Sequence, residues 1–309
     1  MTRWFENALV NYNIEVVGVT KYSDTTYLIK GKQQKVVLRI IDEAKIDLIE
    51  YVASLCLPYF ETIIYNNRKK AVCSYANQYF YVTEFISERS LSKSYYLKSV
   101  IYCIAELHRA TLKYEHIESS FYEKRLISFE ESIKSFEKQD VNLFYKLLNS
   151  QFASPTLWTY VLNETCGKLF LEHFSRIVKL FRMECLNVSS RRIVLNYAHF
   201  DDNCFELVNN KLIGCHKILY DSPIIDLIMF INNAYDESVL TCIKEYTNCF
   251  CLEKEECILL VCMLYSSIKL EFTDDEYHNV YKIIEMSRRI EFIFALEEIL
   301  GIDFSKLNC

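Results

Sequence analysis

The chain has 309 residues, of which 51% are hydrophobic and 15% aromatic, and its 35 basic and 41 acidic residues give a formal net charge of −6. This length predicts one large domain or two smaller lobes with a full hydrophobic core. The acidic balance and the absence of a basic stripe disfavour nucleic acid as a partner. With only five glycines and three prolines, long helices are expected rather than disorder or a β-sandwich.

Neither a signal peptide nor a membrane-spanning segment is expected. The N-terminus has charges among its apolar positions, and no apolar run reaches the roughly 18 residues of a spanning helix. The thirteen cysteines include no CxxC pair, and the densest group, at positions 249, 251, 257 and 262, has no histidine nearby. We therefore expect an intracellular protein with buried free thiols, and neither a zinc site nor insertion into a membrane.

The first third of the chain has the composition of a small β-rich lobe. An amphipathic helix is predicted at 3–12 and a second helix at 44–55, stopped before Pro58. Runs rich in Val, Ile, Thr and Tyr predict five strands, of which the first three form an antiparallel meander, at 15–20, 25–30, 34–41, 61–65 and 79–85.

After Ser87 the pattern becomes helical. Helical periodicity is predicted for 97–111, 121–148, 157–186, 224–234, 237–248, 254–270 and 274–300. A β island interrupts these helices at about 193–216. The order predicts an α+β, two-lobed fold, with an N-lobe at 1–86 (antiparallel sheet plus helix) and a helical C-lobe at 87–309.

Four segments in chain order carry a resemblance to a known family. They are YFYVTEFI at 79–86 followed by Glu88-Arg89, AELHRAT at 105–111, NYAHFDDN at 196–203 and DSPIIDL at 221–227. The first looks like a kinase hinge strand, and the third lies where aminoglycoside and choline phosphotransferases carry HGDxHxxN. The second and fourth are similar to the LAxFHxAS and DxPxxDL motifs of CotS-type bacterial spore-coat proteins. The chain resembles this kinase-like family over essentially its whole length.

The resemblance implies a phosphotransferase fold in which the catalytic and the metal-binding aspartate are both replaced. Phosphoryl transfer needs a carboxylate beside the attacking hydroxyl, and oxygen ligands for magnesium. Counting back from Asn203 places Ala198 at the catalytic Asp position. Counting back from Asp221 places Gly214 at the metal Asp position, so no metal site is expected. Asn203 remains as a vestigial ligand, although an Asn in a loop is also typical of a turn.

A shifted register is the alternative. It places Asp201 at the catalytic position with His199 before it, and Glu206 then takes the place of the metal-binding Asn. If the shifted register does not apply, Asp201 and Asp202 have no catalytic role and belong to an exposed acidic turn. Likewise, His216 is an isolated polar side chain rather than a ligand for a softer metal.

The residues expected to contact the nucleotide phosphates also differ from the family pattern. Arg39 stands where the family has its phosphate-binding lysine, and its different length and forked guanidinium would place a phosphate differently. Its acidic partner on the first helix is expected to be Glu43 or Glu50, a choice the sequence leaves open. The turn at 20–26 contains no glycine, which restricts the approach of backbone amides to phosphates.

The expected function is therefore a catalytically degenerate, structural or interaction component of the spore coat. The resemblance implies synthesis in the mother-cell cytoplasm, spore-coat proteins as partners, and no cofactor. Two alternatives remain: an active ATP- and magnesium-dependent kinase that uses Asp201, acting on a small molecule or a protein, or a pseudokinase that binds nucleotide without transferring phosphate. A small-molecule ligand between the lobes is compatible with each of these hypotheses.

Overall fold

A computed structural model of the chain describes residues 2–85, 93–118, 120–149, 152–198, 211–232 and 235–305. The chain divides into two compact units, one made of 1–110 with 195–220 and the other of 111–194 with 221–309. The predicted lobe boundary at 86/87 falls outside the described residues and stays a prediction.

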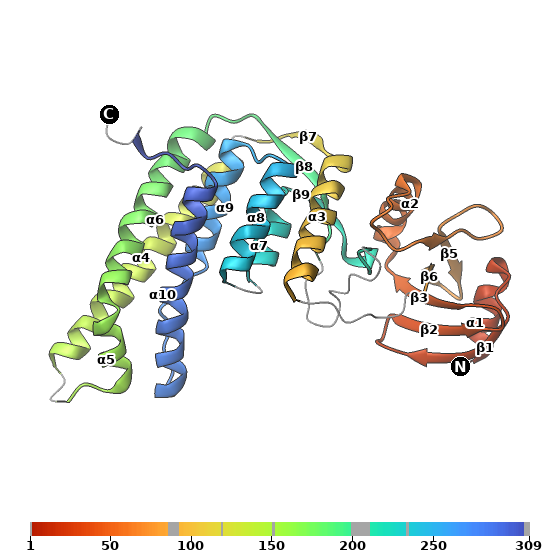
Figure 1. The fold of residues 1–309 in the computed structure, drawn as a ribbon, viewed down its shortest axis with the longest axis horizontal. Helices are drawn as coiled ribbons and strands as arrows, with labels where there is room; N and C mark the ends of the chain where they lie inside the picture. Colours follow the sequence, from red (N-terminus) through yellow and green to blue (C-terminus); the bar gives the residue numbers. More distant parts are fainter. Residues whose placement is uncertain are drawn as a thin grey trace. The chain divides into compact units, whose positions relative to one another are not determined.

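The first unit is built on an antiparallel sheet (Figure 1). Its helical segments are α1 (Thr2–Leu9), η1 (Val10–Tyr12), η2 (Glu43–Lys45), α2 (Ile46–Leu55) and α3 (Lys93–Thr111). Its strands are β1 (Val16–Lys21), β2 (Thr26–Gly31), β3 (Lys35–Ile41), β4 (Ile63–Ile64), β5 (Val72–Tyr75) and β6 (Gln78–Glu84). The predicted meander of the first three strands is confirmed. Strand β5, which pairs with β6, was not predicted.

The sheet runs in the order β1-β2-β3-β6-β4, and successive side chains on β3 and β6 point to opposite faces. Val36, Leu38, Phe80 and Val82 are fully buried in a cluster with α1. The other face therefore carries the odd-numbered positions of the same strands, including Arg39. This alternation turns Arg39 away from the apolar cluster.

The second unit is mainly helical (Figure 1). Its helices are α4 (Ser120–Leu148), α5 (Pro155–Leu162), α6 (Glu164–Cys185), α7 (Ile224–Asn232), α8 (Glu237–Cys249), α9 (Lys254–Ser266) and α10 (Glu276–Ile299). Aromatic rings fill its core, with Phe136 and Phe170 4.2 Å apart between centroids and Phe174 stacked on Tyr265 at 5.4 Å. The aromatic residues at helical spacing thus serve packing in this unit.

The single long helix predicted at 157–186 is wrong, because the chain breaks at Asn163 into α5 and α6. The Asn163 amide donates back to the Thr159 carbonyl at 2.8 Å, and its oxygen accepts from the Ser287 hydroxyl at 2.8 Å. Asparagine offers the backbone such alternative hydrogen bonds, which is why it favours helix ends. Gly167 lies buried near the start of α6.

The β island is a three-stranded sheet in the order β7-β8-β9. It consists of β7 (Lys113–His116), β8 (Ser190–Asn196) and β9 (Leu219–Asp221). Strand β7 was not predicted. Throughout the described ranges, every helix is too short or too polar to cross a membrane.

Candidate functional site

Arg39 lies on the face of β3 opposite the apolar cluster, and its side chain is only 7% exposed. Its Nη1 atom is 2.8 Å from Glu61 Oε2 and 3.1 Å from Thr83 Oγ1. Tyr81 is the cross-strand partner of Arg39, and the guanidinium lies 5.9 Å from the centre of its ring. The cation that would bind phosphate is therefore enclosed by its own unit.

The acidic partner of Arg39 is Glu61, so the expectation of Glu43 or Glu50 is wrong. Glu43 instead accepts a hydrogen bond from the Tyr79 hydroxyl at 3.2 Å. Glu50 accepts from the backbone amides of Ala71 and Val72 at 3.2 and 3.0 Å. Both helical acids thus support neighbouring strands, whereas Glu61, just before β4, reaches the buried face of the sheet.

Glu61 also binds the segment that would carry the metal aspartate. Its Oε1 atom accepts from the backbone N–H of Gly214 at 2.9 Å and from that of Cys215 at 3.3 Å. One carboxylate therefore neutralises Arg39 and satisfies two buried backbone donors. This arrangement is a closed network of an acid, a cation and a loop, named here the Glu61 network.

Backbone pairing holds the same two segments together. Phe60 and Leu212 form a parallel β-bridge. The Glu61 N–H donates to the Leu212 carbonyl at 2.9 Å, and the Leu212 N–H donates to the Tyr59 carbonyl at 2.7 Å. The Lys211 ammonium adds a bond of 2.8 Å to the Thr62 hydroxyl. The loop at 211–215 is thereby fixed to the chain before β4.

The electrostatics of the Glu61 network follow from burial. Burial lowers the pKa of the Arg39 guanidinium, but the adjacent Glu61 carboxylate leaves that pKa above its ordinary value. Burial, reinforced by the Glu61 charge, holds the pKa of the Cys215 thiol well above its usual range. Burial likewise raises the pKa of the Tyr81 hydroxyl. Cys215 and Tyr81 are therefore neutral, and the ion pair carries the charge of the network.

The β1–β2 turn uses its own amides internally. The N–H groups of Tyr22 and Ser23 both donate to the Thr26 carbonyl, at 3.0 and 3.2 Å. The Thr25 N–H donates to the Ser23 hydroxyl at 3.3 Å. These amides are already bonded within the turn, so they do not form a phosphate cradle.

Ala198, at the catalytic Asp position, has a left-handed backbone with φ of 50°. Nearby, the hydroxyl of the buried Tyr197 donates to the Ile213 carbonyl, which ties the catalytic segment to the metal segment. A methyl group at position 198 offers no proton acceptor. The candidates of the shifted register, Asp201, His199 and Glu206, lie outside the described residues together with Asp202 and Asn203.

Gly214, at the metal Asp position, has φ of 96°, a conformation that favours glycine. Its N–H is bonded to Glu61, and it offers no side-chain ligand. Across the described ranges, no group of three acidic, histidine or cysteine side chains is placed to hold a metal ion. Among the described residues at the predicted positions, Arg39 is paired with Glu61, and Gly214 brings no side-chain oxygen ligand for magnesium.

The described cysteines are free thiols. Burial raises the pKa of Cys257 to about 12 and holds that of Cys262 well above its usual range. In the same group, Cys249 is partly exposed and Cys251 is exposed. The two buried thiols are protonated and behave as small apolar side chains.

Asp221, which anchors the motif at 221–227, has a structural role. Its Oδ1 atom lies 2.9 Å from Arg191 Nη1 and accepts from the Ser222 N–H at 2.7 Å. Arg191 also pairs with Glu115 at 2.8 Å and lies over the ring of Phe121. Asp226, at the start of α7, is fully buried. Both motif acids of the described chain thus support the fold.

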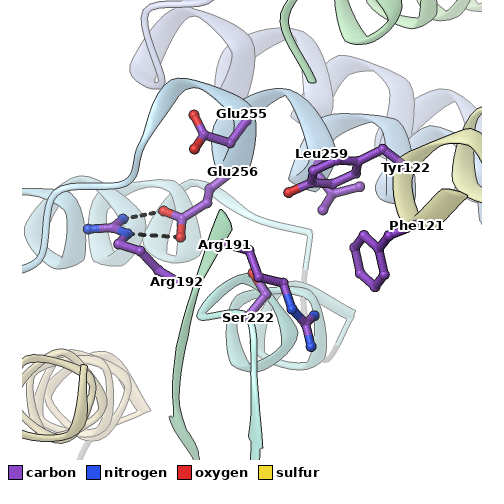
Figure 2. A pocket seen from close by; sticks show the side chains of 8 residues that line it. All are labelled: Phe121, Tyr122, Arg191, Arg192, Ser222, Glu255, Glu256 and Leu259. Atoms are coloured by element: carbon purple, nitrogen blue, oxygen red, sulfur yellow. Dashed lines mark hydrogen bonds and ion pairs between the residues drawn. The ribbon is translucent and has the colours of Figure 1, made fainter. Parts of the chain in front are cut away.

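The neighbouring Arg192 points to the opposite side of β8 and is bonded to Glu256 through two nitrogen atoms (Figure 2). Its guanidinium lies 4.8 Å from the centre of the Phe250 ring and donates to the Cys251 carbonyl at 2.9 Å. The pocket between Arg191, Arg192 and α9 has a volume of only about 10 Å³. That space holds one water molecule at most, so it is not a substrate site.

Sequence reasoning missed Glu61. The signal that could have found it is a single carboxylate within the apolar run at 59–64. Such an acid is buried only when it is paired. The buried cation opposite it is Arg39, in strand β3 of the same sheet.

Comparisons with known proteins place this geometry in a fold class. No family model matches the chain. No curated protein matches it either. Among solved structures, the aminoglycoside phosphotransferase from Alicyclobacillus acidocaldarius is similar with a TM-score of 0.65 at 10% identity, over 96% of both chains. The spectinomycin phosphotransferase APH(9)-Ia, solved with ADP and spectinomycin, matches with a TM-score of 0.51 at 11% identity, over 96% of this chain and 98% of that one.

The chain therefore has the aminoglycoside phosphotransferase-like, protein-kinase-like fold, with an antiparallel N-terminal sheet and a helical C-terminal part. The predicted fold class is confirmed. At this level of identity the likeness concerns the fold alone. None of these comparisons supports the CotS-type family in particular.

Proposed function

We propose that this chain is a catalytically degenerate member of the kinase-like fold that does not transfer phosphate. The observation that carries the proposal is the Glu61 network. It buries Arg39 at the phosphate-binding position and bonds the loop that should present the metal aspartate. Phosphoryl transfer depends on metal-binding carboxylates and on a cation at the phosphates, which kinases hold with an acidic partner. Here an arginine takes the place of the usual lysine, and Gly214 stands in place of the metal-binding acid.

Ala198 supports the proposal independently. Counting back from Asn203 and Asp221 gives positions 198 and 214 for the catalytic and the metal-binding aspartate. These positions are sixteen residues apart, and neither carries a carboxylate. If the chain were an active kinase, both motif assignments, the one counted from Asn203 and the one counted from Asp221, would have to be wrong independently. The simpler explanation is that the fold is retained without its chemistry.

The biological role that we propose is a structural or interaction component of the bacterial spore coat. The support is the resemblance of the segments at 105–111 and 221–227 to CotS-type motifs, together with 23 tyrosines and 13 cysteines available for packing or later cross-linking. The proposed partners are coat proteins. The protein would be synthesised in the mother cell and then incorporated into the coat.

Genetic complementation in a spore-forming host that lacks this chain tests both parts of the proposal. We expect loss of the chain to alter coat composition, and wild type and Asp201→Asn to restore it equally. The matched control is Asp202→Asn, which changes the neighbouring carboxylate. A normal coat without the chain would contradict the coat role. Failure of Asp201→Asn alone would favour the active kinase.

A further inference from the structure

A concentration of exposed apolar side chains marks one end of the second unit. Of the twenty large apolar residues that are well exposed in the described chain, ten fall in three short segments. They are Val141, Phe144, Tyr145, Leu148, Phe152, Trp158, Leu162, Tyr277, Tyr281 and Ile284, named here the α4–α5–α10 patch. Half of the exposed large apolar residues thus come from three segments covering less than a tenth of the chain.

The three segments meet at the same end of the unit. The Tyr160 hydroxyl of α5 donates to the Asp140 carboxylate of α4 at 2.6 Å. One turn earlier, the Thr156 N–H donates to Glu276 of α10 at 2.9 Å. The end of α4, the whole of α5 and the start of α10 lie together in the lower part of Figure 1. The segments that carry these exposed residues therefore lie together at one end of the unit.

Helix α5 shows most clearly that this region is suited to burial. Its sequence, PTLWTYVL, contains no charged residue. Leu157 and Tyr160 are buried against the unit, while Trp158 is 59% and Leu162 is 80% exposed. Trp158 and Leu162 are four residues apart and share one face of the helix. The outer face of a surface helix in a monomer is normally polar, and here it carries a tryptophan and a leucine.

The exposed area matches the requirement of a protein interface. Six of the ten residues are aromatic. At about 200 Å² for each aromatic side chain, their exposed fractions amount to roughly 800 Å². The largest apolar patch of a typical monomer covers about 300–600 Å², and a standard interface buries about 800 Å² on each partner. The aromatic residues alone therefore supply enough apolar area for one side of a stable interface.

We propose that the α4–α5–α10 patch is the interface of a homodimer. Glu285 and Arg288 place both signs on the α10 segment, while Asp275 caps this helix and Lys282 donates to the Glu271 carbonyl. In a two-fold symmetric dimer each patch meets its own copy, so a border with both signs provides its own complementary charges. A membrane surface is a poorer occupant, since interfacial helices carry mainly Lys and Arg around their apolar face, whereas the charged residues beside this patch include Glu285 as well as bases.

Sedimentation velocity over a range of protein concentrations tests the proposal. We expect wild type to form a dimer, and Trp158→Lys with Leu162→Lys to raise the dimer Kd by about 30-fold or more, as for the loss of an interfacial hot spot. The matched control is Ile127→Lys, since Ile127 is 55% exposed on α4 outside the patch. This control is expected to dimerise like wild type. A wild type that stays monomeric throughout, or a dimer that the double variant leaves unchanged, would overturn the proposal.

Tryptophan emission gives a second readout that does not depend on a disruptive change. The chain has two tryptophans, and Trp4 packs against the core of the first unit. In a Trp4→Phe variant the emission comes from Trp158 alone. We expect its maximum to move to shorter wavelength as the protein concentration passes the dimer Kd, because the indole leaves water. Association with no such shift would place the interface elsewhere and overturn the assignment.

Discussion

Replacing Glu61 with alanine is expected to lower the free energy of unfolding by about 3–5 kcal/mol, because the change leaves the Arg39 guanidinium buried without its counter-ion. The side chains of the pair are 7% and 1% exposed, so water does not replace the lost carboxylate. The N–H groups of Gly214 and Cys215 lose their acceptor at the same time. Chemical denaturation followed by circular dichroism measures the loss.

Two controls separate the buried charge from a general effect of mutation. Glu15→Ala removes an ion pair with Lys32 in which both side chains are about two-thirds exposed, and should cost less than about 1 kcal/mol. Arg39→Met combined with Glu61→Leu replaces the pair by apolar side chains and should recover most of the loss. If Glu61→Ala costs no more than Glu15→Ala, the Glu61 network does not exist in solution.

The second large effect is expected from Arg192→Ala, at about 3–5 kcal/mol. Arg192 and Glu256 have side chains only 8% and 6% exposed, and two guanidinium nitrogens bond the carboxylate. The variant also removes the donor to the Cys251 carbonyl and the cation over the Phe250 ring. A buried carboxylate without its partner is the main cost.

The matched control for Arg192 is Arg182→Ala in the same unit. Arg182 is bonded to Glu130 with side chains 58% and 35% exposed, so its loss should cost about 1 kcal/mol or less. Denaturation midpoints of the two variants measure the difference. Equal midpoints would show that Arg192 and Glu256 are hydrated, and would contradict a buried bidentate pair.

Much of the fold was predictable because its elements have strong local patterns. Alternating β-branched residues predicted the first three strands, and helical spacing predicted α7 to α10 within a few residues. Strands β5 and β7 lack this pattern. β7 consists of four exposed polar or aromatic residues, and it pairs with β8. The break at Asn163 likewise depends on Ser287, which is 124 residues away.

Motif spacing is a local property of the chain, so counting from Asn203 and Asp221 predicts Ala198 and Gly214 at the catalytic and metal positions. These two assignments stay predictions. The partner of Arg39 was not predictable by counting, since Glu61 reaches it only after the segment before β4 packs on the odd-numbered face of the sheet. That contact is tertiary. The same holds for the bonds from Glu61 to the loop at 214 and 215, which join segments about 150 residues apart.

Thermal unfolding with and without ATP and magnesium tests most directly whether the nucleotide site is closed. A ligand at a hundred times its Kd stabilises the native state by about 2.7 kcal/mol, which is readily seen as a rise in Tm. Because Gly214 offers no carboxylate and its N–H is already bonded to Glu61, we expect the same Tm with ATP, with magnesium, with both, and with neither. A rise in Tm that requires ATP and magnesium together would show that the site binds nucleotide, and would contradict a closed site.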